Sequence, residues 1–115
     1  MILRAFFLSL IFLPIAGYAH HSVSGLYDRD TVMELEGEVT SVLWRNPHVA
    51  FTMSVRDENG EAQEWDMAMT ALSNLRRWQI PRDFLVVGEA IRVAGSPSKR
   101  GDNAMYVSNA LRPSG

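Results

Sequence analysis

The sequence contains no cysteine among its 115 residues. This absence excludes disulfides, a lipid-modified cysteine and a cysteine nucleophile, so the fold has to be stabilised by packing. The chain also lacks the Gly-x-Ser-x-Gly turn of serine hydrolases and the His-Glu-x-x-His helix of metalloproteases. The sequence therefore makes no case for catalysis by its side chains alone.

An excess of positive charge is also lacking. The chain has 11 lysines and arginines against 13 aspartates and glutamates, a net charge of −2 with histidine neutral. Proteins that bind nucleic acid tightly neutralise phosphates with Lys and Arg and release counterions. We therefore expect no tight binding to nucleic acid.

Long apolar runs are missing after the first residues of the chain. Arg4 precedes an apolar stretch, Ala5 to Ile15, that one serine and one proline interrupt. This stretch is shorter than the ~17 to 25 residues of a transmembrane helix. Small residues, Gly17 and Ala19, then occupy the −3 and −1 positions of a cleavage site, as in a secretory signal peptide. We predict a signal peptide at residues 1–19 that is cleaved before His20. The mature protein would then be periplasmic or secreted, with no stable membrane span.

What the chain does contain is a succession of short strand patterns. In residues 32–44 apolar and acidic residues alternate, which predicts a strand with one buried and one solvated acidic face, and Gly37 predicts a bulge or bend. Strand patterns return at residues 49–55 and 62–69. Asn59-Gly60 between them predicts a two-residue hairpin turn.

The period changes after the third strand pattern. Leu72, Leu75 and Trp78 recur every three residues, which predicts a short helix over residues 70–78. Thr70 is the residue type expected at its N-cap.

Two further strand patterns, at residues 90–94 and 105–111, follow the helix. Three strands, a helix and two strands, with a long bent first strand, form the order of an OB-fold. We therefore predict an all-β protein, a small OB-like five-stranded barrel at residues 32–111. One short helix would lie between strands 3 and 4, and residues 20–31 would form a segment before the barrel.

Several short motifs are shared with one family. The most specific are His-His-Ser at residues 20–22 and Trp-Arg-Asn-Pro-His at residues 44–48, accompanied by Tyr27-Asp28, Gly37-Glu38-Val39, Trp65, Gly88 and Gly95. In these motifs the chain resembles a family of small exported proteins of Gram-negative bacteria that is classed only as a domain of unknown function. The resemblance implies export and a compact β-barrel, but no activity and no site residues.

The three histidines of the chain are candidates for one metal site. His20 and His21 open the predicted mature chain, and His48 lies in the loop between the first two strands. The α-amine and ring of His20 can chelate together, and a further imidazole would complete the nitrogen ligation that Cu(II) favours. This arrangement resembles the histidine brace of copper monooxygenases. We predict copper binding by His20, His21 and His48; a solvated tail, with His48 capping the Asn46-Pro47 turn, is the alternative.

A second candidate site lies on the third strand, where Trp65, Met67 and Met69 alternate and share one face. Thioethers select Cu(I), and an indole offers a cation–π face. The pattern is similar to that of small periplasmic OB-fold copper chaperones of efflux systems. Those proteins place two residues between Trp and the first Met, where this chain has one. Core filling by the same three residues is the alternative.

The sequence thus predicts a periplasmic β-barrel that binds or delivers copper. The alternative is a metal-free module that docks a membrane or periplasmic protein through the barrel face or the loop around Trp44 and His48, since aromatic residues are enriched at interfaces. A copper-dependent oxidase and an oligosaccharide-binding OB-fold are further alternatives.

Overall fold

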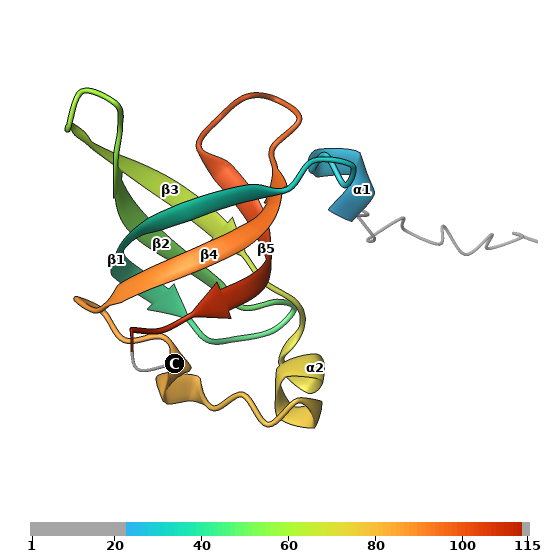
Figure 1. Cartoon of the computed structure of the whole chain (residues 1–115). Helices are drawn as coiled ribbons and strands as arrows, with labels where there is room; N and C mark the ends of the chain where they lie inside the picture. The colour runs from blue at the N-terminus through green and yellow to red at the C-terminus, as the bar shows by residue number, and fades with distance from the viewer. Residues whose placement is uncertain (1–22, 114–115) are drawn as a thin grey trace, which may run out of the picture.

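The alternation of apolar and polar residues produces five strands that close into a barrel in the order β1-β2-β3-β5-β4 (Figure 1). The computed structural model describes residues 23–113. Its strands are β1 (Met33–Leu43), β2 (Ala50–Arg56), β3 (Ala62–Ala68), β4 (Ala90–Pro97) and β5 (Ala104–Leu111). Neighbouring strands are antiparallel except β3 and β5, which are parallel. This architecture confirms the prediction of an OB-like five-stranded barrel.

Within residues 23–113, two α-helices and one 3-10 turn lie outside the barrel. They are α1 (Val23–Leu26), α2 (Leu72–Arg77) and η1 (Arg82–Phe84). The position of α2 between β3 and β4 was predicted, whereas α1 lies in the segment expected to precede the barrel, for which no helix was predicted. None of the helices within residues 23–113 is long and apolar enough to cross a membrane.

The start and end of α2 differ from the prediction. Ala71 is its N-cap, and Thr70 instead accepts a hydrogen bond of 2.7 Å from the side chain of Asn74. Leu75 is buried as the three-residue period predicts, but Trp78 is 59% exposed. Trp78 is the C-cap residue, directly after the helix ends at Arg77.

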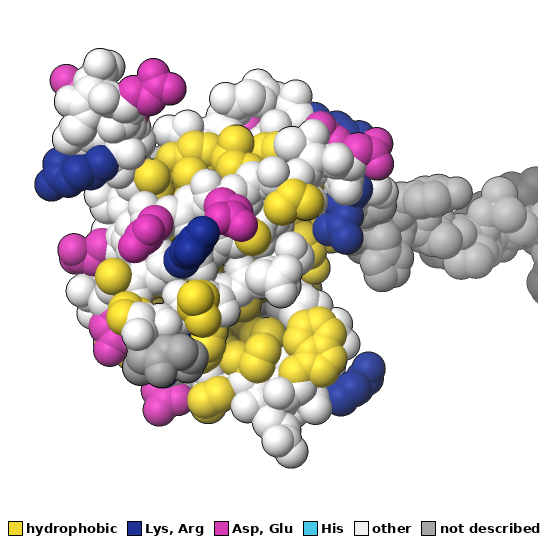
Figure 2. All heavy atoms as spheres, in the orientation of Figure 1, with side chains coloured by type: hydrophobic (Ala, Val, Ile, Leu, Met, Phe, Trp, Pro, Cys, Tyr) yellow, Lys and Arg dark blue, Asp and Glu magenta, His cyan; other side chains and the backbone are white. Residues whose placement is uncertain are grey.

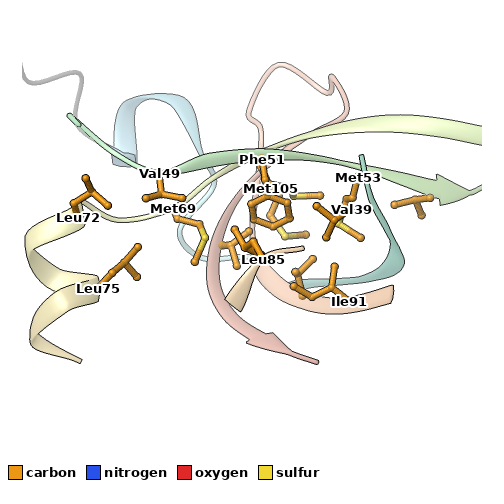
Figure 3. Close-up of a cluster of buried hydrophobic side chains, with 14 residues drawn as sticks. Val39, Val49, Phe51, Met53, Met69, Leu72, Leu75, Leu85, Ile91 and Met105 are labelled. Atoms are coloured by element: carbon orange, nitrogen blue, oxygen red, sulfur yellow. The ribbon is translucent and has the colours of Figure 1, made fainter. Parts of the chain in front are cut away.

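The core contains buried side chains from all five strands and from α2. Its members are Val39, Val49, Phe51, Met53, Val55, Met67, Met69, Leu72, Leu75, Leu85, Ile91, Val93, Met105 and Val107. In Figure 3, Leu72 and Leu75 extend from α2 toward Val49 and Met69. The helix therefore covers one end of the barrel and excludes water from it.

The outer face of β1 is solvated, as its alternation predicts. Glu34, Glu36 and Glu38 are exposed. Arg92 of β4 forms an ion pair of 2.9 Å with Glu34, and both side chains are more than half exposed. Figure 2 shows charged side chains of both signs over this part of the barrel.

The bulge in β1 does not lie at Gly37, where the sequence predicted a bulge or bend. The register between β1 and β2 shifts between Val39 and Ser41. Gly37 serves a different purpose, because a Cβ at this position would overlap with the carbonyl oxygen of Ser54 on β2. The glycine therefore permits the close approach of two neighbouring strands.

The hairpin between β2 and β3 is longer than the predicted two residues. The connection comprises residues 57–61. The carboxylate of Asp57 accepts hydrogen bonds from the backbone N–H groups of Asn59, at 2.8 Å, and Glu61, at 3.0 Å. Gly60 has a φ of 78°, which the turn requires. The side chain of Asp57 therefore organises a wider turn than the Asn-Gly pair alone suggests.

Candidate functional site

The segment before the barrel is held against the connection between β4 and β5, where Figure 1 shows α1. We call residues 23–29 the N-terminal arm. The backbone N–H of Lys99 donates to the carbonyl of Leu26 at 3.0 Å. The ammonium of Lys99 donates to the carbonyl of Ser24 at 2.7 Å. One residue of the connection therefore holds two positions of the arm.

Aromatic contacts attach the same arm to β5. The rings of Tyr27 and Tyr106 lie 5.8 Å apart between centroids, and the guanidinium of Arg29 lies 5.4 Å from the ring centroid of Tyr106. The backbone N–H of Asp28 donates to the carbonyl of Pro97 at 2.9 Å. The arm is thus part of the packed structure rather than a tail.

The arm forms one wall of a cavity of about 390 Å³, which we call the arm pocket. Its lining comprises Val23, Leu26, Tyr27, His48, Ala68, Met69, Ala71 and Tyr106. These residues come from the arm, the β1–β2 loop, the end of β3, the start of α2 and β5. No Asp, Glu, Lys or Arg is among the residues that line it.

A second, more polar hollow of about 290 Å³ adjoins the arm pocket on the outer face of the barrel. Tyr27, His48 and Ala68 line both cavities. Ser41, Thr52 and the exposed Asp66 contribute polar groups to the second one, so we call it the polar hollow. OB-folds bind ligands on the face of the second and third strands and at the adjoining loops, which is where both cavities lie.

Tyr27 is the titratable group that this environment changes most clearly. Its burial raises the pKa of the phenol, and the carboxylates of Asp102 and Asp66 raise it further. A hydrogen bond from the hydroxyl of Ser98 lowers the pKa of the Asp102 carboxyl, which keeps that negative charge in place. The phenol of Tyr27 is therefore uncharged and able to donate a hydrogen bond.

Among the predicted copper ligands, His48 is exposed in the loop between β1 and β2. His20 and His21 lie outside the described residues. Val23, two positions after His21, lines the arm pocket together with His48. Within residues 23–113, no three His, Asp or Glu side chains are grouped so that they could hold a metal ion.

In the second predicted set, Trp65 and Met67 lie on β3 and Met69 directly follows that strand. Met67 and Met69 are 2% and 7% exposed and belong to the core cluster. Trp65 is half-buried and packs against that cluster. The structure therefore places these residues as the alternative of core filling predicts.

The comparison with protein families gives one match. A sequence profile of the family of unknown function DUF6152 matches residues 9–106. The chain belongs to this family. The resemblance to a domain of unknown function that the motifs indicate is thereby confirmed, and the DUF6152 assignment brings no activity with it. Among curated proteins, none has a sequence that matches this DUF6152 chain.

Solved structures of single-stranded DNA-binding proteins share the barrel of this DUF6152 chain. The mitochondrial protein Rim1 of S. cerevisiae matches with a TM-score of 0.54 and 7% identity, over 72% of this chain and 92% of Rim1. A small single-stranded DNA-binding protein from Streptomyces coelicolor matches with a TM-score of 0.50 and 16% identity, over 71% of this chain and 90% of that protein. At these identities the likeness shows the fold alone.

Sequence reasoning missed the arm and its contacts. α1 has four residues, too few to show a helical period. Tyr106 carried a detectable signal, because the alternation along residues 105–111 places it opposite the buried Met105 and Val107. Nothing in the sequence pairs Tyr106 with Tyr27, since that contact depends on how the chain returns to the arm.

Proposed function

We propose that the mature protein is periplasmic and binds copper through the α-amine and ring of His20, with His21 or His48 as a further ligand. One observation carries the proposal: Val23 and His48 line the same pocket. His21 and His20 precede Val23 by two and three residues, which span at most ~7 Å and ~11 Å. The imidazoles of His20 and His21 can therefore reach the rim of the pocket at His48.

The fixed position of the arm also supports the proposal. Lys99 holds the carbonyl of Ser24, which lies four residues after His20 in the chain. A ligand set that is already confined near its partner loses less freedom when the metal binds. The exposure of His48 leaves this side of the site open to a protein that delivers or receives the metal.

The donor set fits Cu(II) better than other divalent ions. Amine and imidazole nitrogens follow the Irving–Williams order, in which copper binds most tightly. Each of these ligands must be deprotonated, so binding weakens as the pH falls. Asp66, which lines the polar hollow together with His48, can add a carboxylate oxygen.

The test compares two N-termini. The intact mass of the protein purified from the periplasm should correspond to a chain that begins at His20. This protein and a variant with one Met before His20 are titrated with Cu(II), and paramagnetic resonance spectra are recorded. We expect one Cu(II) per chain, with affinity reduced by about tenfold or more in the extended variant. His48→Ala should have a smaller effect.

Several outcomes would contradict this assignment. A mature chain that begins elsewhere would lack the terminal chelate. An identical spectrum and affinity in the native and extended proteins would rule out the N-terminal site. Binding of Cu(I) that is lost on Met67→Leu or Met69→Leu assigns the metal to the third strand instead. If no copper binds with a Kd below ~10 μM, the metal-free alternative takes precedence.

That alternative is a module that docks a membrane or periplasmic protein. One observation favours it, an open hollow of about 660 Å³ where the end of β1 meets residues 81–87. Val87 in this hollow is 60% exposed and its neighbour Val86 is 37% exposed. Exposed apolar side chains that adjoin one another often mark an interaction site.

A further inference from the structure

We propose that the arm pocket binds a small, uncharged and largely apolar molecule that carries one hydrogen-bonding group. The apolar ligand does not require bound copper, although His48 belongs both to this lining and to the proposed copper ligands. The proposal depends on the size of the pocket, the chemistry of its walls and the way the arm is held over it.

The size of the pocket suits a small ligand. Its volume is about 390 Å³, near the lower end of the ~300 to 1,000 Å³ found for ligand pockets. The hollow beside residues 81–87 is larger at about 660 Å³. That hollow includes Arg82 and Asp83 and lacks a roof such as the arm, so it is the weaker candidate.

The walls of the arm pocket select against charge. Five of the lining side chains are aliphatic: Val23, Leu26, Ala68, Met69 and Ala71. An ion that entered would lose hydration without gaining an opposite charge, which is costly. The remaining side chains are Tyr27, His48 and Tyr106, which offer two phenol groups and one imidazole. These walls match an apolar body with one polar group.

The pocket exists because the arm is attached to the barrel. Val23, Leu26 and Tyr27 belong to the arm, and without them the other five lining residues would form an open surface. The hydrogen bonds from Lys99 to the arm keep this wall in position. A wall that is formed before the ligand arrives lowers the ordering cost of binding.

The test uses the mature protein in the presence of a metal chelator, so that copper plays no part. The probe is N-phenyl-1-naphthylamine, an uncharged aromatic molecule whose fluorescence rises in apolar surroundings. We expect saturable binding at one site per chain. Ala71→Phe fills the pocket and should weaken binding about tenfold. Ala62→Phe is the matched control, because Ala62 is exposed on β3 and outside the pocket lining.

A second variant guards against misfolding. Leu26→Ala removes one wall and should weaken binding in the same direction, while circular dichroism shows that all three variants keep the barrel. Absence of saturable binding would overturn the proposal, and so would equal loss in Ala71→Phe and Ala62→Phe. Tighter binding of the sulfonated probe 1-anilinonaphthalene-8-sulfonate would overturn the uncharged ligand class. Because no copper is present, failure of the copper proposal leaves these outcomes unchanged.

Discussion

Tyr27 packs against Tyr106 with their ring planes inclined by 50° and their centroids 5.8 Å apart. Tyr27 belongs to the N-terminal arm and Tyr106 to β5, so the contact joins a segment outside the barrel to one of its strands. Both rings also line the arm pocket. The position of the arm therefore depends on β5 and on the connection before it.

The first prediction concerns Lys99. Lys99→Met keeps the aliphatic stem and the backbone hydrogen bond to Leu26 but removes the ammonium that donates to Ser24. We expect a loss of about 1 kcal/mol or less in the free energy of unfolding, because the bond is exposed. Cu(II) titration and the fluorescent probe should both show weaker binding. Arg100→Met is the control, because it removes one positive charge from the same connection. Equal weakening of binding in the two variants would assign the effect to charge rather than to the hydrogen bond with Ser24.

The second prediction concerns acid stability and Asp57. The backbone N–H of Glu61 is the main cause that lowers the pKa of the Asp57 carboxyl from 3.8, with help from Gln63 and Asn59. Because the folded pKa lies below the unfolded one, the stabilisation is present above pH 3.8 and is lost as the pH falls through the folded pKa.

Asp57→Asn tests this linkage. The asparagine side chain carries no charge, and its NH2 group cannot accept the hydrogen bond that Gln63 donates to the carboxylate of Asp57. Urea unfolding should show the variant less stable than the native protein at neutral pH, with the difference shrinking below pH 3.8. A difference that stays constant with pH would show that the carboxylate charge contributes nothing.

The third prediction concerns close approach of strands at Gly95. A Cβ at this position would overlap with the carbonyl oxygen of Tyr106. Gly95→Ala should therefore reduce the free energy of unfolding by about 1 to 3 kcal/mol, the range for overpacking. Gly60→Ala is the control, because nothing lies within 4 Å and only the φ of +78° is strained, which costs about 1 to 2 kcal/mol. A loss in urea unfolding at Gly60 alone would show that the strand contact at Gly95 does not oppose a methyl group.

The fourth prediction concerns single-stranded DNA. The solved proteins that share the fold bind it, but this chain has a net charge of −2, and Glu64 and Asp66 are exposed on β3. We expect no binding tighter than ~10⁻⁴ M at physiological salt. Fluorescence anisotropy with a labelled oligonucleotide at two salt concentrations measures the affinity for single-stranded DNA. A micromolar complex that weakens with salt would show that the charge argument fails.

The sequence by itself determined the class of fold. Alternation along residues 32–44 placed three glutamates outside and Val39 inside, because side chains of a strand point to opposite faces in turn. The strand order with one helix before β4 was enough to predict an OB-like barrel. These features are local, so they can be recognised without knowledge of the contacts between distant residues.

Only the tertiary structure decided where the arm lies and which residues share the arm pocket. Lys99 and Ser24 are separated by 75 positions, and no periodic pattern relates residues so far apart. The same applies to Trp78, which the three-residue period groups with the buried Leu72 and Leu75 but which is exposed at the C-cap of α2. His48 carried a local signal as a histidine in a loop, but its proximity to Val23 results from closure of the barrel and attachment of the arm to β5.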